Sequence, residues 1–294
     1  MAYGSPASLE GVGAYYTHIR AGWKPSPEQL EDLVGRYRAI GGPSPLLRIT
    51  VKQASGLQAS LSGSGSETRV YAGMKHSAPF IGDVVKRARS EGVDELLCIA
   101  LAPHYSSISI GGYMRAVEEA KGGLGRGFDV TFVKSWHAYP KLVSMWAQRI
   151  TSACQRAGAD PSLVFSAHSL PERIIAEGDP YKDQLLETSR LIAKQAGWND
   201  WSFAFQSASK TGEPWLGPDI LECLDRLYEA GKRSFLLAPI GFVSDHLEIF
   251  YDIDVECKDW ATKRGARLTR CELPNDSQDL VGCLREIVAV EGFI

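Results

Sequence analysis

Three carboxylates near the C-terminal end of the sequence, Glu248, Asp252 and Glu256, follow one another at four-residue intervals. On a helix, residues four apart lie on the same face about 6 Å from each other, so this spacing predicts a row of negative charge. No Lys or Arg lies between Glu248 and Glu256, and each like-charged pair destabilises a helix by roughly 0.2–0.5 kcal/mol. The pattern favours a site or route for a cation, and a solvated acidic helix face is the alternative interpretation.

A second group of reactive residue types follows a buried strand. The apolar run 163–167 leads directly into His168, and the run 235–243 leads into Asp245, His246 and Glu248. Open parallel sheets place ligands at the carboxyl ends of their strands, so we expect His168 and Glu248 to face each other across a cleft. A neutral imidazole there can bind a metal or accept a proton near pH 7, whereas the alternative is a histidine hydrogen-bonded within a loop.

The composition is that of an ordinary globular protein. The chain has 294 residues, 44% hydrophobic and 23% charged residues, and a net charge of -3. It therefore lacks the basic character of a nucleic-acid-binding protein. Its apolar stretches are as short as strands and its start does not read as a secretory signal, so we expect a cytoplasmic protein without stable membrane insertion.

The cysteines are scattered. Six are present without a C-x-x-C pair, which in a cytoplasmic protein indicates free thiols rather than disulfides or a zinc site. An iron–sulfur cluster that uses Cys257, Cys271 and Cys283 is the alternative, and their wide spacing argues against it.

Apolar, strand-like runs alternate with amphipathic segments along the whole chain, which predicts an α/β fold with parallel sheets. The expected strands cover 69–74, 95–102, 129–133, 162–167, 201–206 and 234–240, and the expected helices cover 79–92, 140–157, 179–197 and 219–231. A strand ending in Ala-Pro occurs in each half, at 102–103 and at 238–239. We therefore expect two similar doubly wound, Rossmann-like domains with parallel four-stranded sheets and an active-site cleft between them.

The expected domains are residues 1–133, residues 134–274 with His168 and Glu248, and a C-terminal helix in 275–294 that packs back on the first domain. Residues 1–6 resemble the end of a strand without its preceding apolar residues. We therefore expect a truncated first strand, and a gain in thermal stability when an apolar strand is added upstream.

Several segments together resemble one known family. Tyr15-Tyr-Thr-His-Ile-Arg20, Ser166-Ala-His168-Ser-Leu-Pro, Pro214-Trp-Leu-Gly-Pro-Asp and 241–257 are similar, in the same order, to segments of ferrochelatases, which insert ferrous iron into a porphyrin. The motifs are long and span nearly the whole chain. The start Ala2-Tyr3-Gly4-Ser5-Pro6 is most similar to the ferrochelatases that metallate coproporphyrin III, in which a Tyr faces the metal.

The resemblance implies a function for each matching residue. His168 and Glu248 would be catalytic, taking the pyrrole protons and handing over Fe²⁺, which is a substrate. Asp252 and Glu256 would continue the metal path that begins at His168 and Glu248, with Arg36 at an outer site that could hold a divalent cation such as Mg²⁺. No iron–sulfur cluster is expected, and neighbouring enzymes of haem synthesis are possible transient partners.

The resemblance also implies contacts to the porphyrin and its propionates, for which Arg forks and hydroxyl groups are chemically suited. The residues concerned are Tyr3, Arg20, Arg36, Ser44, Gln53, Lys75, Ser109, Tyr113 and Trp215.

Three other functions stay open at this point. The first is a protoporphyrin IX ferrochelatase, against which Tyr3 argues. The second is a cobalt or nickel chelatase for a less oxidised tetrapyrrole, which would be expected to use more histidines. The third is a non-catalytic carrier of haem or porphyrin.

Overall fold

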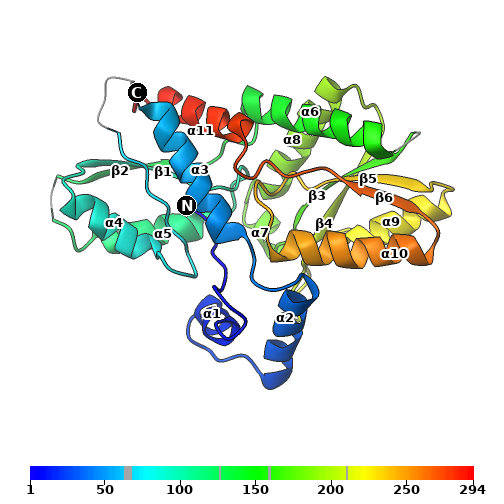
Figure 1. Cartoon of the computed structure of the whole chain (residues 1–294), viewed down its shortest axis with the longest axis horizontal. Helices are drawn as coiled ribbons and strands as arrows, with labels where there is room; N and C mark the ends of the chain where they lie inside the picture. Colours follow the sequence, from blue (N-terminus) through cyan, green and yellow to red (C-terminus); the bar gives the residue numbers. More distant parts are fainter. Residues whose placement is uncertain (63–67, 126, 158–159, 210) are drawn as a thin grey trace.

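Two parallel sheets, one in each half of the chain, form the frame of the molecule (Figure 1). The computed structural model describes residues 1–62, 68–125, 127–157, 160–209 and 211–294. The alternation of helices and strands confirms the α/β class expected from the sequence.

The second sheet has four parallel strands in the order β4-β3-β5-β6. They are β3 (Ser162–His168), β4 (Trp201–Gln206), β5 (Ser234–Ala238) and β6 (Arg267–Arg270). Helices α6 (Pro140–Ala157) and α8 (Tyr181–Ala196) lie on one face, and α9 (Ile220–Glu229) and α10 (Lys258–Lys263) lie on the other (Figure 1). Because both faces are covered, the central strands β3 and β5 read as continuous apolar runs rather than alternating ones.

The first sheet is smaller than expected. In the described part of the chain it has two parallel strands, β1 (Glu95–Ile99) and β2 (Asp129–Val133). The segment 69–74, predicted as a strand, makes only bridges, at Met74 to Ala2 and Phe80. The expectation of four strands in both sheets is therefore corrected: among the described residues, segment 69–74 forms isolated bridges with Ala2 and Phe80 rather than a strand of the sheet. Helices α3 (Leu46–Leu61), α4 (Ile81–Ser90) and α5 (Ile110–Lys121) pack around this half.

Two short helices protrude from the body of the molecule (Figure 1). They are α1 (Val12–Ile19) and α2 (Pro27–Ala39), and α2 begins with a capping box between Ser26 and Gln29. Helix α2 packs against η1 (Ile249–Cys257), which links the N-terminal residues to the second half. The short α7 (Arg173–Ala176) follows β3.

The C-terminal helix α11 (Gln278–Val290) packs against α3 and α6. It therefore contacts elements from both halves of the chain. The domain boundaries stay a prediction.

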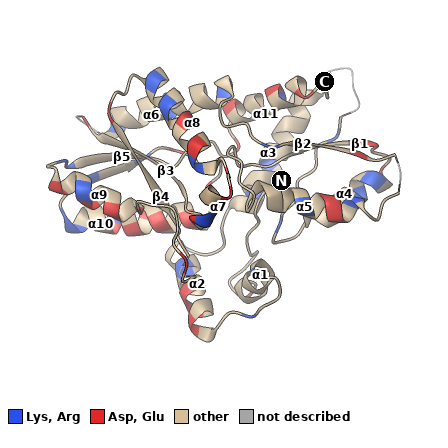
Figure 2. Ribbon diagram, turned by 180° about the vertical axis from the view of Figure 1, so that it is seen from behind, with Lys and Arg blue, Asp and Glu red and all other residues tan. Residues whose placement is uncertain are grey.

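Charge is distributed without a single dominant sign. Acidic and basic side chains are interspersed along α9 and α10, and both signs occur across the molecule (Figure 2). Within the described ranges, every helix is too short or too polar to traverse a bilayer.

The acidic segment forms a π-helix, η1, rather than the expected α-helix. Asp252 is 4% exposed and lies on the buried side with Ile249 and Ile253, whereas Glu256 is exposed. Burial, then the Glu248 charge and, to a smaller extent, the Glu256 charge raise the pKa of Asp252. The three carboxylates therefore lie close enough to act on one another, and their use as a path for a cation stays a prediction.

Candidate active site

His168 and Glu248 meet at the carboxyl edge of the second sheet. His168 ends β3, and Glu248 immediately precedes η1 in the segment after β5. The imidazole Nε2 lies 3.4 Å from the carboxylate Oε1, and the two side chains are 30% and 34% exposed. The convergence predicted from the sequence is confirmed, and the pair is accessible from solvent.

Gly241 lets the segment after β5 come this close to β3. Its N–H donates to the Ser166 carbonyl at 3.2 Å. A Cβ at Gly241 would lie 2.5 Å from the Ala167 Cβ, far inside van der Waals contact. The close backbone approach that only glycine permits therefore brings the Glu248 segment toward His168.

Each of the two side chains shifts the pKa of the other. Burial alone would lower the pKa of His168, but the Glu248 charge and its hydrogen bond raise that pKa to about 9. Burial would raise the pKa of Glu248, yet His168 and then His246 hold it well below its usual range. Both shifts favour an ion pair of imidazolium and carboxylate.

Backbone and tyrosine contacts orient His168. The Tyr181 hydroxyl donates to the His168 carbonyl at 3.0 Å. The imidazole Nδ1 contacts the Ser169 carbonyl, and the Ser169 hydroxyl donates to the Leu216 carbonyl at 2.7 Å. These contacts leave Nε2 facing Glu248.

His246 is a second imidazole at Glu248 that was not among the predicted site residues. Its Nε2 lies 3.4 Å from Glu248 Oε2, and its Nδ1 lies 3.0 Å from the Ser244 carbonyl. The sequence held a signal for it, because His246 stands in the same Asp-His-Leu-Glu segment as Glu248.

Gln53 supports this turn from α3. It is 1% exposed, and its Nε2 donates to the Ser244 hydroxyl at 2.8 Å and to the Asn275 carbonyl at 2.7 Å. Gln53 was predicted to contact the porphyrin. In the structure the buried Gln53 side chain instead hydrogen-bonds to the turn that carries His246, and so positions that turn.

Asp252 is held by residues at the end of β4. Gln206 Nε2 donates to Asp252 Oδ2 at 3.2 Å, and the Ser207 hydroxyl donates to the same oxygen. Burial and then the Glu248 charge raise the pKa of Asp252 to about 6. Gln206 and Ser207 were not predicted, although Gln206 ends a strand at the same sheet edge as His168.

The outer end of the acidic segment meets α2. The Arg36 guanidinium carbon lies 5.0 Å from the centre of the Tyr251 ring, and Arg36 Nε pairs with Asp32 at 3.1 Å. Burial raises the pKa of Glu256 and the Arg36 charge opposes that shift. Across the described residues, no three His, Cys, Asp or Glu side chains are grouped closely enough to enclose an ion. The carboxylates therefore form a dispersed row rather than a closed metal cage.

Tyr3 lies beside His76 in the N-terminal part of the chain, with 4.5 Å between the two ring centres. Burial and then the Glu248 charge raise the pKa of Tyr3, and the same carboxylate contributes to the raised pKa values of Tyr15 and Tyr37. The first forty residues and the second half of the chain therefore share one electrostatic environment around Glu248.

Three other predicted substrate contacts lie near Tyr3. Lys75 Nζ lies 5.6 Å from the centre of the Tyr113 ring, and burial followed by the Arg115 charge lowers the pKa of Lys75. Tyr113 is 5% exposed, and Ser109 stands at the N-cap position of the same helix, α5, without a side-chain capping bond. Burial and then Tyr3 raise the pKa of Tyr113, and the Lys75 N–H donates to the carbonyl of Ala2, the residue before Tyr3, at 2.9 Å.

The remaining predicted contacts show mainly local interactions. Trp215 lies with its ring centre 6.4 Å from that of His168, and its Nε1 donates to Thr211 at 2.9 Å. The Arg20 guanidinium carbon lies 5.7 Å from the Tyr16 ring centre, and its buried Nε has no hydrogen-bond partner. Ser44 accepts a bond from the Leu46 N–H at 3.2 Å. Of these three residues, only Trp215 has a contact with the His168–Glu248 pair, through the rings of Trp215 and His168.

Comparison with known proteins decides the family. The model of the family described as ferrochelatase matches residues 1–291 of this chain. The chain belongs to the ferrochelatase family. It is therefore an enzyme, a lyase of haem biosynthesis that inserts Fe²⁺ into a porphyrin, and it is similar to ferrochelatases that are named for coproporphyrin III.

The similar relatives match over nearly their whole length. A protein from Herpetosiphon aurantiacus named ferrochelatase is 44% identical over 98% of this chain and 96% of its own. Proteins named coproporphyrin III ferrochelatase from Bacillus mycoides and coproporphyrin III ferrochelatase 2 from Bacillus cereus are 44% and 45% identical, over 98% of this chain and 94% and 92% of their own.

A solved structure shares the fold. SirB from Bacillus subtilis with Fe³⁺ superposes with a TM-score of 0.59 at 10% identity, over 82% of this chain and 89% of its own. At this identity the similarity concerns the fold alone, and it confirms the two-sheet chelatase architecture.

Proposed function

We propose that the porphyrin substrate of this ferrochelatase is coproporphyrin III, which it converts to coprohaem with release of two protons. The observation that supports this most directly is the position of Tyr3, which lies within electrostatic range of Glu248 and packs on His76. Similar relatives that carry the coproporphyrin III name add further support. Protoporphyrin IX is the alternative substrate, and the relative named only ferrochelatase is neutral between the two.

The His168–Glu248 pair would supply the proton chemistry. Iron insertion requires two pyrrole N–H protons to leave the ring. Glu248 is ionised at neutral pH, since His168 and His246 keep its pKa low, so it would attract Fe²⁺. A divalent cation at Glu248 would break the ion pair and lower the pKa of His168, which would release its proton to solvent. The neutral imidazole could then accept one pyrrole proton and pass it to solvent before it accepts the second, so that both protons leave as Fe²⁺ enters the ring.

The dispersed row of carboxylates is suited to passing a metal ion on to the porphyrin rather than to holding it. An ion that must pass to the porphyrin is better served by incomplete coordination, because a closed protein cage would retain it. Asp252 and Glu256 would accompany Fe²⁺ toward Glu248, and the exposed end at Glu256 and Arg36 could hold an outer divalent cation such as Mg²⁺. These metal assignments are part of the proposal.

Lys75, Ser109 and Tyr113, near Tyr3, would bind propionates on one side of the ring. Coproporphyrin III has four propionates, and lysine and hydroxyl groups are suitable partners for them. We also propose a cytoplasmic location, which the six free thiols support.

Turnover on two porphyrins tests the proposal. Fe²⁺ is added anaerobically to the purified protein with coproporphyrin III or protoporphyrin IX, and absorbance follows metallation. We expect faster turnover of coproporphyrin III. A preference for protoporphyrin IX would contradict the proposed substrate, and tight haem binding without iron-dependent conversion would indicate a carrier.

A further inference from the structure

Five acids occupy the segment 245–256, and the proposed metal path uses three of them. The other two are Asp245, three residues before Glu248, and Asp254, six residues after it. Their side chains are only 16% and 21% exposed. Burial of a carboxylate is costly unless a partner compensates its charge, so both of these acids need such a partner.

The partner of both acids is Arg270, the last residue of β6. Its Nε and Nη2 donate to the two carboxylate oxygens of Asp254 at 3.2 and 2.9 Å, and its Nη1 donates to Asp245 at 3.1 Å. Arginine can form this forked contact with a carboxylate, whereas lysine cannot. Lys258 is a second partner of Asp254, at 3.1 Å, but its side chain is 55% exposed. One guanidinium therefore connects the residues on either side of Glu248.

The sheet holds Arg270 at this place. Strand β6 lies beside β5, with Arg270 opposite Leu237 (Figure 1). The next N–H, that of Cys271, donates to the Leu237 carbonyl at 2.8 Å. The segment that carries Glu248 leaves the sheet at the end of β5, directly beside this strand end. A residue on a strand is held more rigidly than one on a loop, so Arg270 is a fixed point for that segment.

Asn275 holds the Asp245 end of this arrangement. Its side chain donates to Asp245 Oδ2 at 2.7 Å and accepts from the Asp245 N–H at 2.8 Å. Its own N–H donates to the Val243 carbonyl at 2.8 Å. Arg270 binds the other oxygen of Asp245, Oδ1. Both oxygens of this carboxylate are therefore engaged, and Asp245 connects Arg270 firmly to the start of the segment.

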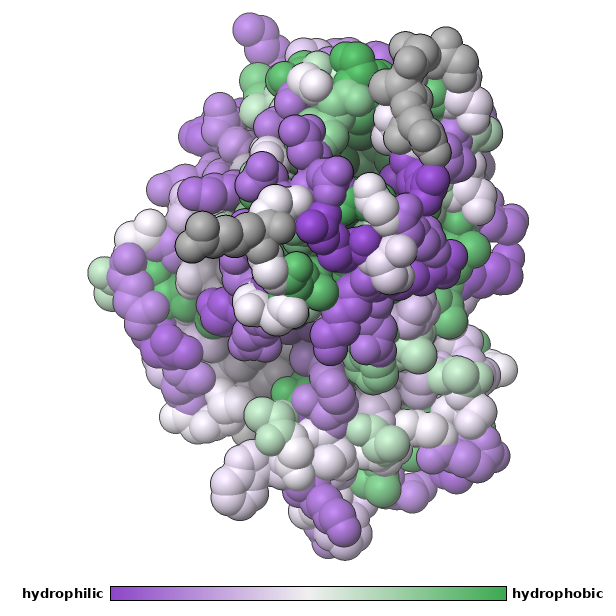
Figure 3. All heavy atoms as spheres, turned by 90° about the vertical axis from the view of Figure 1, so that its left-hand side faces the viewer, coloured by the Kyte–Doolittle hydropathy of each residue, from purple (hydrophilic) through white to green (hydrophobic). Residues whose placement is uncertain are grey.

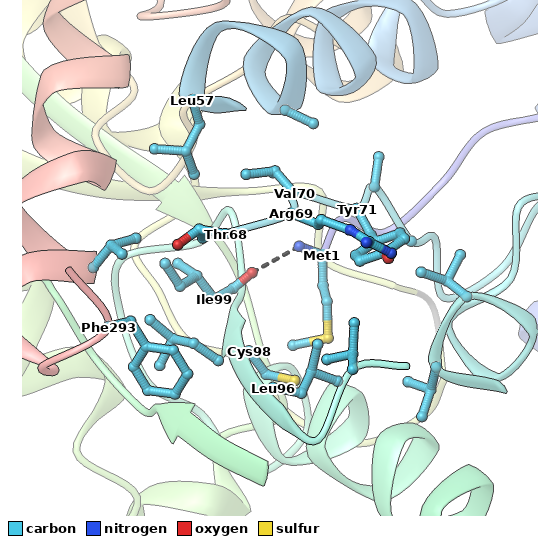
Figure 4. A pocket seen from close by; sticks show the side chains of 18 of the residues that line it. Met1, Leu57, Thr68, Arg69, Val70, Tyr71, Leu96, Cys98, Ile99 and Phe293 are labelled. Carbon is cyan, nitrogen blue, oxygen red and sulfur yellow. Dashed lines mark hydrogen bonds between the residues drawn. The ribbon is translucent and has the colours of Figure 1, made fainter. Parts of the chain in front are cut away.

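The burial of Arg270 differs from the distribution of side chains in the first half of the chain. On the face that carries α4, β1 and β2, hydrophilic side chains predominate at the surface (Figure 3). The space beside β1 is lined by apolar side chains, among them Leu57, Leu96 and Ile99 (Figure 4). Arg270 is a charged side chain that is only 15% exposed. Arginine is seldom buried to this degree unless it is paired, and its two carboxylate partners account for its position.

Arg270 also divides the five acids by their partners. The two flanking acids are paired with it. In the described ranges of the chain, Glu248, Asp252 and Glu256 form no ion pair with a Lys or Arg, and the partners of Glu248 are imidazoles. The three acids of the proposed metal path are thus the three without a guanidinium or ammonium partner.

We propose that Arg270 is a positioning residue for Glu248: by binding Asp245 and Asp254 together, it fixes the turn from which the Glu248 carboxylate meets His168. This inference rests on the role proposed above for Glu248 in iron insertion. Arg270 acts through Glu248, so its loss should slow iron insertion and leave the affinity for the porphyrin nearly unchanged.

Arg270→Lys tests the proposal, because lysine keeps the positive charge and loses the fork. We expect kcat for iron insertion to fall at least about tenfold, with KM for the porphyrin within about twofold of the wild type. Arg149→Lys is the matched control. Arg149 is also 15% exposed and joins Ser277 to Asp279 at the start of α11, so its kcat should stay within about twofold. An unchanged kcat in Arg270→Lys, or an equal loss in the control, would overturn the proposal.

A double-mutant cycle separates the positioning of Glu248 from a general loss of structure. Single-turnover metallation is measured for Glu248→Gln with and without Arg270→Lys. We expect Arg270→Lys to change the rate less than about threefold once Glu248 is replaced, because residues that act as a unit are not additive. The same loss of about tenfold or more in both backgrounds would overturn the proposal.

The cycle also distinguishes this inference from the proposed function. A normal rate of Arg270→Lys beside a slow rate of Glu248→Gln would contradict only the role of Arg270. A Glu248→Gln rate close to that of the wild type would contradict the proposed role of Glu248 and this inference with it.

Thermal unfolding shows whether each variant is folded at the assay temperature. If Arg270→Lys does not fold, the cycle is run with Asp254→Asn, which keeps the size of the side chain and weakens the contact of Arg270 with η1. A rate loss of at least about threefold that disappears in the Glu248→Gln background would support the proposal. No loss, or a loss that persists in that background, would overturn it.

Discussion

At the scale of single residues, the site depends on two imidazoles that share the Glu248 carboxylate and on Asp252, which follows it in the chain. His168 and His246 each lie 3.4 Å from an oxygen of Glu248, and Asp252 lies on the first turn of η1 after it. Glu248 is therefore the residue through which proton and metal chemistry are coupled. Substitution of Glu248 should therefore change the rate of iron insertion without a matching change in porphyrin affinity.

Glu248→Gln keeps the shape of the side chain and removes its charge. We expect the rate of iron insertion to fall about 100-fold or more, while the affinity for the free-base porphyrin changes little. Steady-state rates and fluorescence titration with coproporphyrin III measure the two quantities. A large loss of porphyrin affinity with little loss of rate would show that Glu248 serves to bind the ring.

Gln206→Leu tests the support of Asp252. It removes the donor at 3.2 Å from Asp252 and a weaker bond to the Glu248 carbonyl at 3.4 Å. We expect a higher KM for Fe²⁺ with little change in KM for the porphyrin, because Asp252 would be protonated more readily. Ser189→Ala, a buried hydroxyl in α8 that bonds only within its helix, is the control. Equal effects of both substitutions on KM for Fe²⁺ would contradict a role for Gln206.

At the scale of elements, the close approach of the segment after β5 to the end of β3 brings the site together. Gly241 is the contact point, since a Cβ there would overlap Ala167. The same segment also contains Ser244, whose hydroxyl accepts a hydrogen bond from Gln53 of α3.

Gly241→Ala should destabilise the fold by about 1–3 kcal/mol through overpacking. Gly282→Ala is the matched control, since it lies in α11 with no atom within 4 Å of the added Cβ, and it should be neutral or stabilising by up to about 1 kcal/mol. Urea unfolding gives both values. The prediction is wrong if the two variants are equally stable.

The sequence predicted the strands and helices with strong apolar patterns. β3 and β5 are buried apolar runs. His168 was recognised at the end of the first run, and Glu248 was recognised from the spacing of the carboxylates in the segment after the second. β6 was missed, because Arg267-Leu-Thr-Arg270 is short and charged at both ends. The π-helical turn of η1 was also missed, since the same four-residue spacing fits an α-helix until packing decides which residues are buried. Gln53 illustrates the limit for single residues: its two partners lie 191 and 222 positions away, so no local pattern could place it.

At the scale of the whole molecule, the two halves meet through the N-terminal residues. Residues 1–4 lie between segment 73–76 and the end of β1. Within this pairing, burial and then the Glu248 charge raise the pKa of Tyr3. The stability of the first sheet and the geometry of the site are therefore connected through three consecutive residues.

The Met1 ammonium gives a pH dependence of stability. Its pKa is lowered from 8.0 to about 6 in the folded chain, so between these values the unfolded chain binds more protons. Stability should therefore rise by about 2–3 kcal/mol as the pH increases from 6 to 8, and fall again as the pH is lowered through this window. Urea unfolding across the window measures it. Acetylation of Met1 removes the titrating group, and an identical pH profile after acetylation would contradict this origin.

Single-turnover iron insertion by His168→Ala tests the central claim most directly. The variant and the wild-type chain are each loaded with coproporphyrin III and mixed anaerobically with Fe²⁺, and absorbance follows coprohaem formation. We expect the variant to bind the porphyrin and to metallate it at least about 100-fold more slowly than the wild type. Metallation by the variant within a few fold of the wild-type rate would show that the imidazole facing Glu248 does not carry the reaction.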